Sequence, residues 1–302
     1  MEKNYSACQE PNAFFQTAFQ RNIGLLTTEE QNKLRQSRIA IVGVGGVGGF
    51  HLLNLVRLGV GKFSIADLET FETPNIQRQC GAFINTLGQN KAEAMKKMAL
   101  EINPHIEIQT FSQGINAQNI DQFLEGADVF LDGIDFFAIE ERRLSFQKAR
   151  AKGIYAITAG PLGFGCALLI FSPSGMSFDQ YFDLNDSMSY LEKIVSFGVG
   201  LAPKCLQLKY LSLNCVDITG KRGPSLVSSC VLCSAIATTE AIKIILKRKR
   251  PHCAPHYLQF DPYLQALKKG YLLGGNRNPI QRIKRWYLVK KCSVKPDASK
   301  TR

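Results

Sequence analysis

The chain has 302 residues and a net charge of +12, from 37 Lys and Arg against 25 Asp and Glu. A hydrophobic fraction of 45% excludes a disordered chain, and the length is enough for one large α/β domain or two small ones. Residues 243–302 hold 16 basic and 2 acidic residues, which leaves 21 basic and 23 acidic residues before them. The body is therefore nearly neutral, which excludes a uniformly cationic scaffold for nucleic acid.

The predicted elements alternate between short apolar strands and helical periods. Strands are expected at 38–42, 62–66, 106–111, 129–131, 154–158, 166–171 and 256–260. Helices are expected at 27–36, 50–58, 89–102, 119–124, 139–151 and 230–246. This alternation predicts βαβ units and an α/β, doubly wound, mainly parallel sheet with a Rossmann-like nucleotide-binding half. Residues 172–229 lose the periodicity, and we expect a long crossover loop region there.

The strongest local motif is a glycine cluster that follows the first strand and opens a helix. Gly43 permits a tight turn, Gly45 and Gly46 let a phosphate approach the backbone, and Gly48 allows close packing of the helix on the strand. Asp67 ends the second strand, where a carboxylate accepts hydrogen bonds from ribose hydroxyls. The motif predicts binding of either a dinucleotide or ATP.

The residues that follow Asp67 favour ATP. Asn75 and Arg78 lie in the loop after the second strand, and Lys91 opens the next helix. Cations that converge on a triphosphate stabilise the charge that builds on phosphoryl oxygens as pyrophosphate leaves. Asp135 follows the strand at 129–131 and supplies a carboxylate at the same sheet edge, where Mg²⁺ could be held.

The sequence resembles the ThiF/MoeB/HesA adenylyltransferases, which are related to the ubiquitin-activating enzymes. The resemblance covers residues 21–246 and rests on IVGVGGVGG, NIQRQ, GQNKAEA, INPHIEI and LDGID. It implies that ATP binds on the glycine turn and that a carboxylate attacks the α-phosphate to give an acyl-adenylate. The carboxylate would belong to a ubiquitin-like carrier protein, a peptide or a small molecule.

The resemblance also implies roles for individual residues. Asp67 would hold the ribose, Asn75, Arg78 and Lys91 the phosphates, and Asp135 the Mg²⁺. We therefore expect Arg78, Lys91 and Asp135 to be catalytic.

One further catalytic residue is implied near the N-terminus. Arg21 matches an arginine that in this family reaches the ATP of the other subunit, so the resemblance implies a homodimer.

The chain departs from the family pattern at its cysteines. Cys230 and Cys233 form a lone C-x-x-C pair, so a four-thiolate zinc site is not expected and buried structural thiols are. No cysteine lies near Gly220, where a thioester-forming cysteine would fall, and Cys215 and Cys205 are the nearest upstream thiols.

A second departure lies beside the expected metal ligand. Phe136 replaces the Asn that usually follows the metal aspartate. These departures favour a member that transfers the acyl group directly to a nucleophile.

The basic C-terminal segment is a separate feature. Residues 278–291 place Ile280, Ile283 and Tyr287 on one face of a predicted helix, with basic residues elsewhere. Such a helix could lie on an anionic membrane surface, dock a partner, grip tRNA, or pack its apolar side on its own domain. We therefore divide the chain into an arm (1–26), an adenylyltransferase domain (27–260) and a basic tail (261–302).

Three features that we do not find in the sequence predict its cellular compartment. No stretch approaches 18 uninterrupted apolar residues, the N-terminus has no signal-peptide pattern, and nine cysteines without framework spacing indicate free thiols. We expect a cytoplasmic protein that is peripheral to a membrane if residues 278–291 bind lipid.

Two alternatives to the adenylyltransferase stay open. The glycine turn also fits an NAD-dependent oxidoreductase, although none of the four histidines falls at a suitable strand end. A non-catalytic nucleotide-binding partner protein is consistent with Phe136 and with the missing cysteine.

Overall fold

The computed structural model describes residues 10–212, 215–218 and 220–293 of the chain. Its eight strands form one sheet in the order β3-β2-β1-β4-β5-β6-β7-β8. The strands are β1 (Arg38–Val42), β2 (Lys62–Ala66), β3 (Glu107–Phe111), β4 (Val129–Asp132), β5 (Tyr155–Leu162), β6 (Gly165–Phe171), β7 (His256–Asp261) and β8 (Ala266–Tyr271). The first five pair in parallel and the last three pair antiparallel, so the doubly wound, mainly parallel fold is confirmed.

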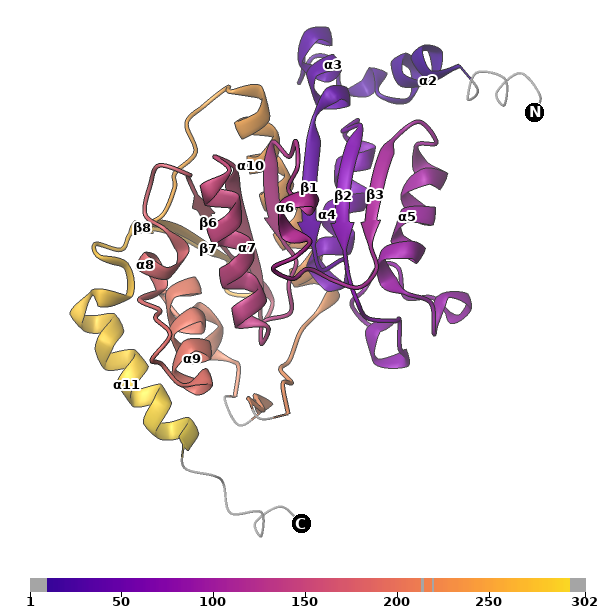
Figure 1. The fold of residues 1–302 in the computed structure, drawn as a ribbon. Coiled ribbons are helices and arrows are strands. Elements are labelled where there is room, and N and C mark those ends of the chain that lie inside the picture. Colours follow the sequence, from indigo (N-terminus) through magenta and orange to yellow (C-terminus); the bar gives the residue numbers. More distant parts are fainter. Residues whose placement is uncertain (1–9, 213–214, 219, 294–302) are drawn as a thin grey trace.

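Helices cover both faces of the sheet (Figure 1). The helices of the structure are α2 (Pro11–Ala18), α3 (Thr28–Gln36), α4 (Gly46–Arg57), α5 (Lys91–Ile102), α6 (Ile120–Phe123), α7 (Ile139–Ala151), α8 (Phe178–Phe182), α9 (Tyr190–Leu201), α10 (Val227–Leu246) and α11 (Pro279–Ser293). Along β1, Ile39 and Ile41 enter the core beneath α3, α4, α5 and α10, whereas Ala40 and Val42 enter the core beneath α6, α7, α8 and α9. This period of two is what a strand buried on both faces requires.

Several expected elements are confirmed at their boundaries. In the structure, β1, β2 and α7 begin and end at the predicted residues. The side chain of Thr27 accepts a hydrogen bond from the Glu30 backbone N–H, and the Glu30 carboxylate accepts one from the Thr27 N–H, so a capping box starts α3.

The crossover region is more regular than we expected. Within residues 172–229 the structure places α8, α9 and the 3-10 turn η4 (Leu206–Lys209). A capping box of Ser189 and Glu192 starts α9, and this pattern in the sequence could have predicted the helix. The many Gly, Ser and Asp residues around it obscured that signal.

The segment after residue 260 is joined to the sheet. β8 pairs with β7 from end to end, and α11 packs against α9. β8 was not predicted because four of its six residues, including Lys268 and Lys269, are exposed and show no apolar alternation. The expected tail of residues 261–302 therefore begins inside the packed structure.

The helix α10 is by length and composition apolar enough to cross a membrane, although half of its most apolar window is buried in this fold. Its buried residues include Cys233, Ala237 and Ala241, and it packs against α4, β5 and β6. That packing is typical of the core helix of an α/β domain.

Candidate functional site

The glycine turn connects β1 to α4 through contacts that leave no room for side chains. Gly43 has a φ of +76°, and a Cβ on it would lie 2.3 Å from the carbonyl oxygen of Gly133. A Cβ on Gly48 would lie 1.7 Å from the carbonyl oxygen of Gly43. The expected roles of Gly43 in the turn and of Gly48 in helix packing are therefore confirmed.

The first turn of α4 has the features of an anion site. Its N-cap, Gly45, provides no side-chain hydrogen bond, so the backbone N–H groups of the first turn point outward without a side-chain cap. Two side chains border it: Gln79 lies 3.2 Å from the Cβ position of Gly45, and the Cys230 Sγ lies 3.2 Å from that of Gly46. The turn is thus flanked by the loop after β2 and by the start of α10.

Asp67 follows the end of β2, as we expected, and it lies against the glycine turn. Its carboxylate accepts hydrogen bonds from the backbone N–H groups of Val44 (2.9 Å) and Glu69 (3.0 Å). Burial raises the pKa of the Asp67 carboxyl above its usual range, and the nearby Lys91 charge opposes that shift. Asp67 therefore connects the second strand to the glycine turn.

Arg78 also reaches the turn. Its Cγ lies 4.0 Å from the Cβ position of Gly46, and its guanidinium donates to the Pro74 carbonyl at 3.1 Å. Asn75, at the end of the 3-10 turn η2 (Thr73–Asn75), accepts a hydrogen bond from the Glu72 N–H at 3.0 Å. This loop holds Arg78 beside the first turn of α4.

Lys91 starts α5 and is almost fully buried, with its side chain 3% exposed. Its ammonium pairs at 2.6 Å with Glu69, a carboxylate that is 63% exposed. We did not predict Glu69, although its position two residues after Asp67 places it at the same strand end. A phosphate could replace this exposed carboxylate as the partner of Lys91.

Asp135 lies in the loop after β4 and is exposed. One of its oxygens accepts a hydrogen bond from the Phe137 N–H at 2.9 Å, which orients the carboxylate. In Figure 1 the loops after β1, β2 and β4 all leave the same, lower edge of the sheet. The structure therefore brings the glycine turn, Asp67, Arg78, Lys91 and Asp135 to one edge.

A buried arginine that we did not predict organises the loop of Asp135. Arg142 pairs with Asp132 at 2.8 Å, and both side chains are at most 3% exposed. The same guanidinium donates to the backbone carbonyls of Ile134, Asp135 and Phe136 and stacks over a phenyl ring. The signal in the sequence was an aspartate inside an apolar strand end with an arginine ten residues later.

Of the two aspartates at the end of β4, Asp135 is the one available to Mg²⁺. Arg142 occupies Asp132, and the described residues contain no group of three or more potential His, Cys, Asp or Glu ligands. Mg²⁺ is usually held by one or two carboxylates together with substrate phosphates, so Asp135 fits as a ligand for a nucleotide-bound ion.

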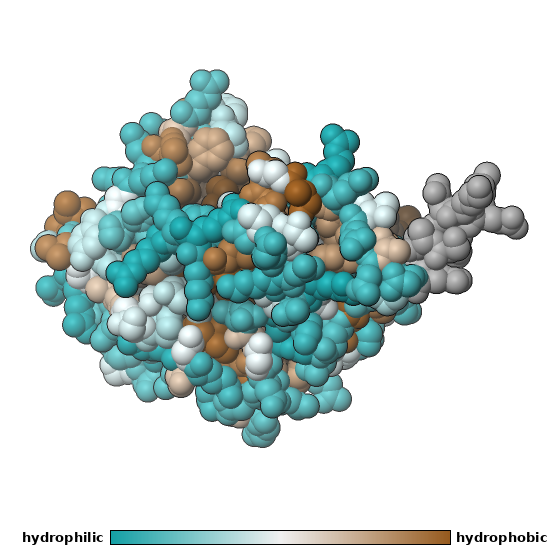
Figure 2. Space-filling view, turned by 90° about the horizontal axis from the view of Figure 1, so that it is seen from above, coloured by the Kyte–Doolittle hydropathy of each residue, from teal (hydrophilic) through white to brown (hydrophobic). Residues whose placement is uncertain are grey.

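Arg21 is not brought to this edge within one chain. It is exposed in the 3-10 turn η1 (Gln20–Asn22), and the neighbouring Asn22 donates to the carbonyl of Leu58 at the C-terminal end of α4. A helix of 12 residues is about 18 Å long, so Arg21 and the glycine turn lie at opposite ends of α4. Figure 2 looks onto this opposite side, where hydrophilic residues predominate and hydrophobic residues gather in separate patches.

The two cysteines of the C-x-x-C pair are packing residues. Cys230 and Cys233 are 1% and 0% exposed, which confirms the expectation of buried thiols. Both belong to the same buried cluster as Cys166 of β6. Cys215 is exposed and Cys205 is half-buried. The expectation that the acyl group is transferred directly, without a cysteine thioester, stays a prediction.

Phe136 packs into an aromatic cluster. Its ring centroid lies 5.3 Å from that of Phe137 and 5.2 Å from that of Phe197 in α9. The residue that departs from the family pattern thus connects the Asp135 loop to the crossover region.

Comparison with known proteins identifies the family. The model of the ThiF family matches residues 19–276. The chain belongs to the ThiF family. The resemblance predicted from the motifs is therefore confirmed, and it extends further toward the C-terminus than residue 246.

Curated relatives match over part of the chain. The chain is 38% identical over 109 residues to a probable molybdopterin-synthase adenylyltransferase of Porphyra purpurea, covering 36% of this chain and 28% of that protein. It is 34% identical over 118 residues to the tRNA threonylcarbamoyladenosine dehydratase of Bacillus subtilis (strain 168), covering 39% of this chain and 46% of that protein. The chain thus matches less than half the length of either relative.

Solved structures share the fold. PaaA has a TM-score of 0.61 at 18% identity, covering 90% of this chain and 74% of that one. MccB from E. coli, solved with ATP, has a TM-score of 0.59 at 18% identity, covering 80% of this chain and 65% of that one.

Proposed function

We propose that this member of the ThiF family is an ATP-dependent adenylyltransferase that activates a carboxylate. The observation that carries the proposal is the convergence of an uncapped helix N-terminus, two cations and two carboxylates at one sheet edge. A helix N-terminus together with Arg78 and Lys91 suits a triphosphate better than the single pyrophosphate of a nicotinamide dinucleotide. The name of the Porphyra relative is consistent with this activity.

The proposed reaction is a displacement at phosphorus. An oxygen of the substrate carboxylate bonds to the α-phosphorus of ATP, the bond between that phosphorus and the bridging oxygen of the β-phosphate breaks, and pyrophosphate leaves with the electron pair. Asp67 binds the ribose, while Arg78 and Lys91 hold the phosphates and stabilise the developing charge. Mg²⁺ on Asp135 would supply further charge neutralisation when bound.

The names of related proteins support a substrate class. The names of related proteins include a SAMP-activating enzyme E1 of Haloferax volcanii, and MccB was also solved with MccA. We propose the C-terminal carboxylate of a small carrier protein or peptide as the substrate, with a small-molecule carboxylate as the alternative.

Exchange of labelled pyrophosphate into ATP tests the activity. With a supplied carrier or peptide, the wild type exchanges label in the presence of Mg²⁺, and Arg78→Ala or Asp135→Ala lowers the rate by about 100-fold or more. Arg57→Ala, at the far end of α4, is the matched control and retains the wild-type rate. Exchange that is unchanged in both site variants would refute the assignment, and saturable NADH binding that ATP displaces would favour the oxidoreductase.

We further propose a homodimer in which Arg21 completes the site of the other subunit. The support is its exposure and its distance from the glycine turn of its own chain. Mixing Arg21→Ala with Asp135→Ala tests this arrangement, because one site of the mixed dimer then contains both intact residues. Exchange restored by mixing two inactive variants is the expected result, and no restoration after the subunits have exchanged would contradict it.

A further inference from the structure

The helix α11 is oriented opposite to the usual rule for an amphipathic helix. Its polar residues face the protein: Gln281 is 2% exposed, and the side chain of Arg285 is 16% exposed. Its large apolar residues face outward: Ile280, Ile283 and Trp286 are 64%, 66% and 64% exposed. The sequence alternative in which the apolar side packs on the protein's own domain is therefore wrong.

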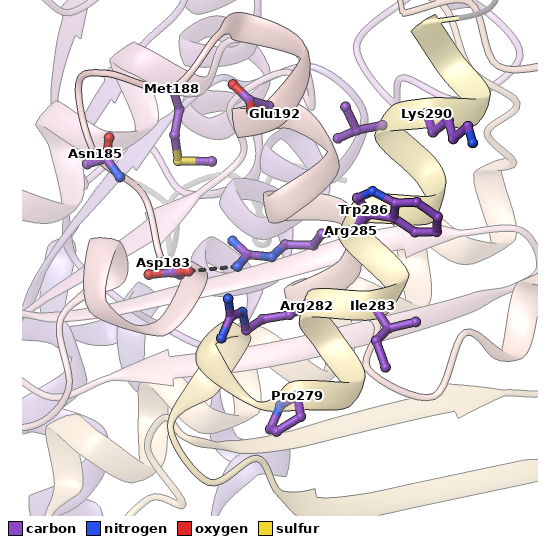
Figure 3. Close-up of a pocket in the computed structure, with 11 residues that line it drawn as sticks. Asp183, Asn185, Met188, Glu192, Pro279, Arg282, Ile283, Arg285, Trp286 and Lys290 are labelled. Carbon is purple, nitrogen blue, oxygen red and sulfur yellow. Dashed lines mark hydrogen bonds and ion pairs between the residues drawn. The ribbon is translucent and has the colours of Figure 1, made fainter.

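Hydrogen bonds on the inner side fix this orientation. The Gln281 amide donates to the Val199 carbonyl at 3.1 Å, and the Lys284 ammonium donates to the Pro203 carbonyl at 2.7 Å. Arg285 pairs with Asp183 at 2.7 Å (Figure 3). Rotating the helix to bury its apolar side would withdraw the donors from the buried Val199 and Pro203 carbonyls. A buried carbonyl left unpaired costs more than its hydrogen bond contributes.

The outward side combines an apolar stripe with free cations. At about 100° per residue, Ile283, Trp286 and Tyr287 share the outward arc, and Arg282 and Lys291 bound it on either side. Among the described residues these two cations have no ion-pair partner. The helix contains no acidic residue.

A groove of about 840 Å³ runs beside the stripe, between α11 and residues 183–192. Arg282 and Trp286 line it from α11, and Met188 lines it from the other wall (Figure 3). Its two carboxylates are outnumbered by three cations, Arg282, Arg285 and Lys290, and Asp183 is already paired with Arg285. The charge left for a ligand in and around the groove is therefore positive.

We propose that the outward side of α11 binds the surface of an anionic lipid bilayer. The stripe is an exposed face of the helix in which a tryptophan and a tyrosine stand beside isoleucines, and such rings favour the boundary between headgroups and acyl chains. The flanking cations complement lipid phosphates, and each adds to binding at an anionic surface. The hydrogen bonds on the inner side of α11 hold this face outward before the protein contacts a bilayer.

Tryptophan fluorescence tests the proposal without any knowledge of the substrate. Trp286 is the single tryptophan of the chain, so its emission reports this helix alone. Vesicles of phosphatidylcholine with phosphatidylglycerol shift the emission to shorter wavelength, and vesicles of phosphatidylcholine alone shift it much less. About 1 M NaCl, where the Debye length is roughly 3 Å, weakens the binding.

Two variants and two matched controls make the test specific. Ile280→Ser with Ile283→Ser lowers the partition coefficient by about tenfold or more, whereas Leu25→Ser, at a leucine 79% exposed on the opposite side, leaves it unchanged. Replacing Arg282, Lys290 and Lys291 with glutamine lowers the partition coefficient by about tenfold or more. Replacing Lys33, Lys97 and Lys249 with glutamine changes the net charge of the protein by the same amount. This control has a much smaller effect on the partition coefficient.

Four outcomes would overturn the proposal. These are an emission that anionic vesicles do not change, equal losses in the matched controls, a concentration-dependent shift without lipid, and an equal shift with poly-glutamate. A concentration-dependent shift without lipid would indicate that the stripe binds a second copy of this chain. An equal shift with poly-glutamate would indicate that it binds an acidic protein.

Discussion

The nucleotide-binding half and the region around α11 place polar residues in opposite ways. At the carboxyl edge of the parallel strands, polar side chains follow apolar strands and gather where a ligand can reach them, as Asp67 and Asp135 do. Around α11 the polar side chains of Asn276 and Gln281 are buried, and the isoleucines and the tryptophan are exposed. Polarity thus marks a binding site in the first region and an internal contact in the second.

The largest expected effect concerns the buried ion pair between Arg142 and Asp132, which organises the loop of Asp135. Arg142→Met leaves the Asp132 carboxylate, 1% exposed, without its cation and frees three backbone carbonyls. We expect a loss of about 3–5 kcal/mol in the free energy of unfolding, measured by urea denaturation.

Two controls interpret that loss. Arg143→Met, one residue later, removes ion pairs to carboxylates that are 42–94% exposed, and we expect a cost of about 1 kcal/mol or less. Adding Asp132→Asn to Arg142→Met removes the uncompensated charge and recovers part of the stability. Equal effects of Arg142→Met and Arg143→Met would show that the buried pair does not organise the loop.

A second prediction concerns His51 in α4, whose ring has no hydrogen-bond partner among the described residues. Burial lowers the pKa of His51 from 6.5 to about 3. Between these values the unfolded chain binds one more proton than the folded chain, so stability falls as the pH drops below 6.5. The slope is about 1.4 kcal/mol per pH unit, which amounts to about 2 kcal/mol at pH 5.

Replacing the ring isolates this contribution. His51→Leu flattens the dependence of stability on pH between about 7 and 5, and His252→Gln, at an exposed histidine, does not. Parallel pH profiles for wild type and His51→Leu, from urea denaturation, would contradict the buried neutral state of His51.

The third and smallest effect tests the inverted polarity of α11 directly. Gln281→Ala removes a buried amide and leaves the Val199 carbonyl unpaired, for a loss of about 1–2 kcal/mol in the free energy of unfolding. Ile283→Ser changes a side chain that is 66% exposed, and we expect a change within about 0.5 kcal/mol. The opposite order, with the isoleucine more important, would mean that α11 packs by its apolar side.

The same contrast explains what the sequence could predict. The local sequence pattern was sufficient to predict β1, β2, the glycine turn and the position of Asp67, because each of these features depends on residues close together in the chain. Glu69 and Arg142 were missed because their roles depend on which charge they meet after folding. The orientation of α11 was open because it depends on carbonyls of α9 and of Pro203, some eighty residues earlier.

The most direct test of the central claim is ATP binding, because it requires no knowledge of the substrate. Calorimetric titration of the wild-type protein with ATP and Mg²⁺ should give saturable binding at one site per chain. Arg78→Ala should weaken that binding by at least about tenfold, and Arg57→Ala should leave it unchanged. The absence of saturable binding, or equal affinity in the wild type and Arg78→Ala, would contradict the proposal that this edge of the sheet is an ATP site.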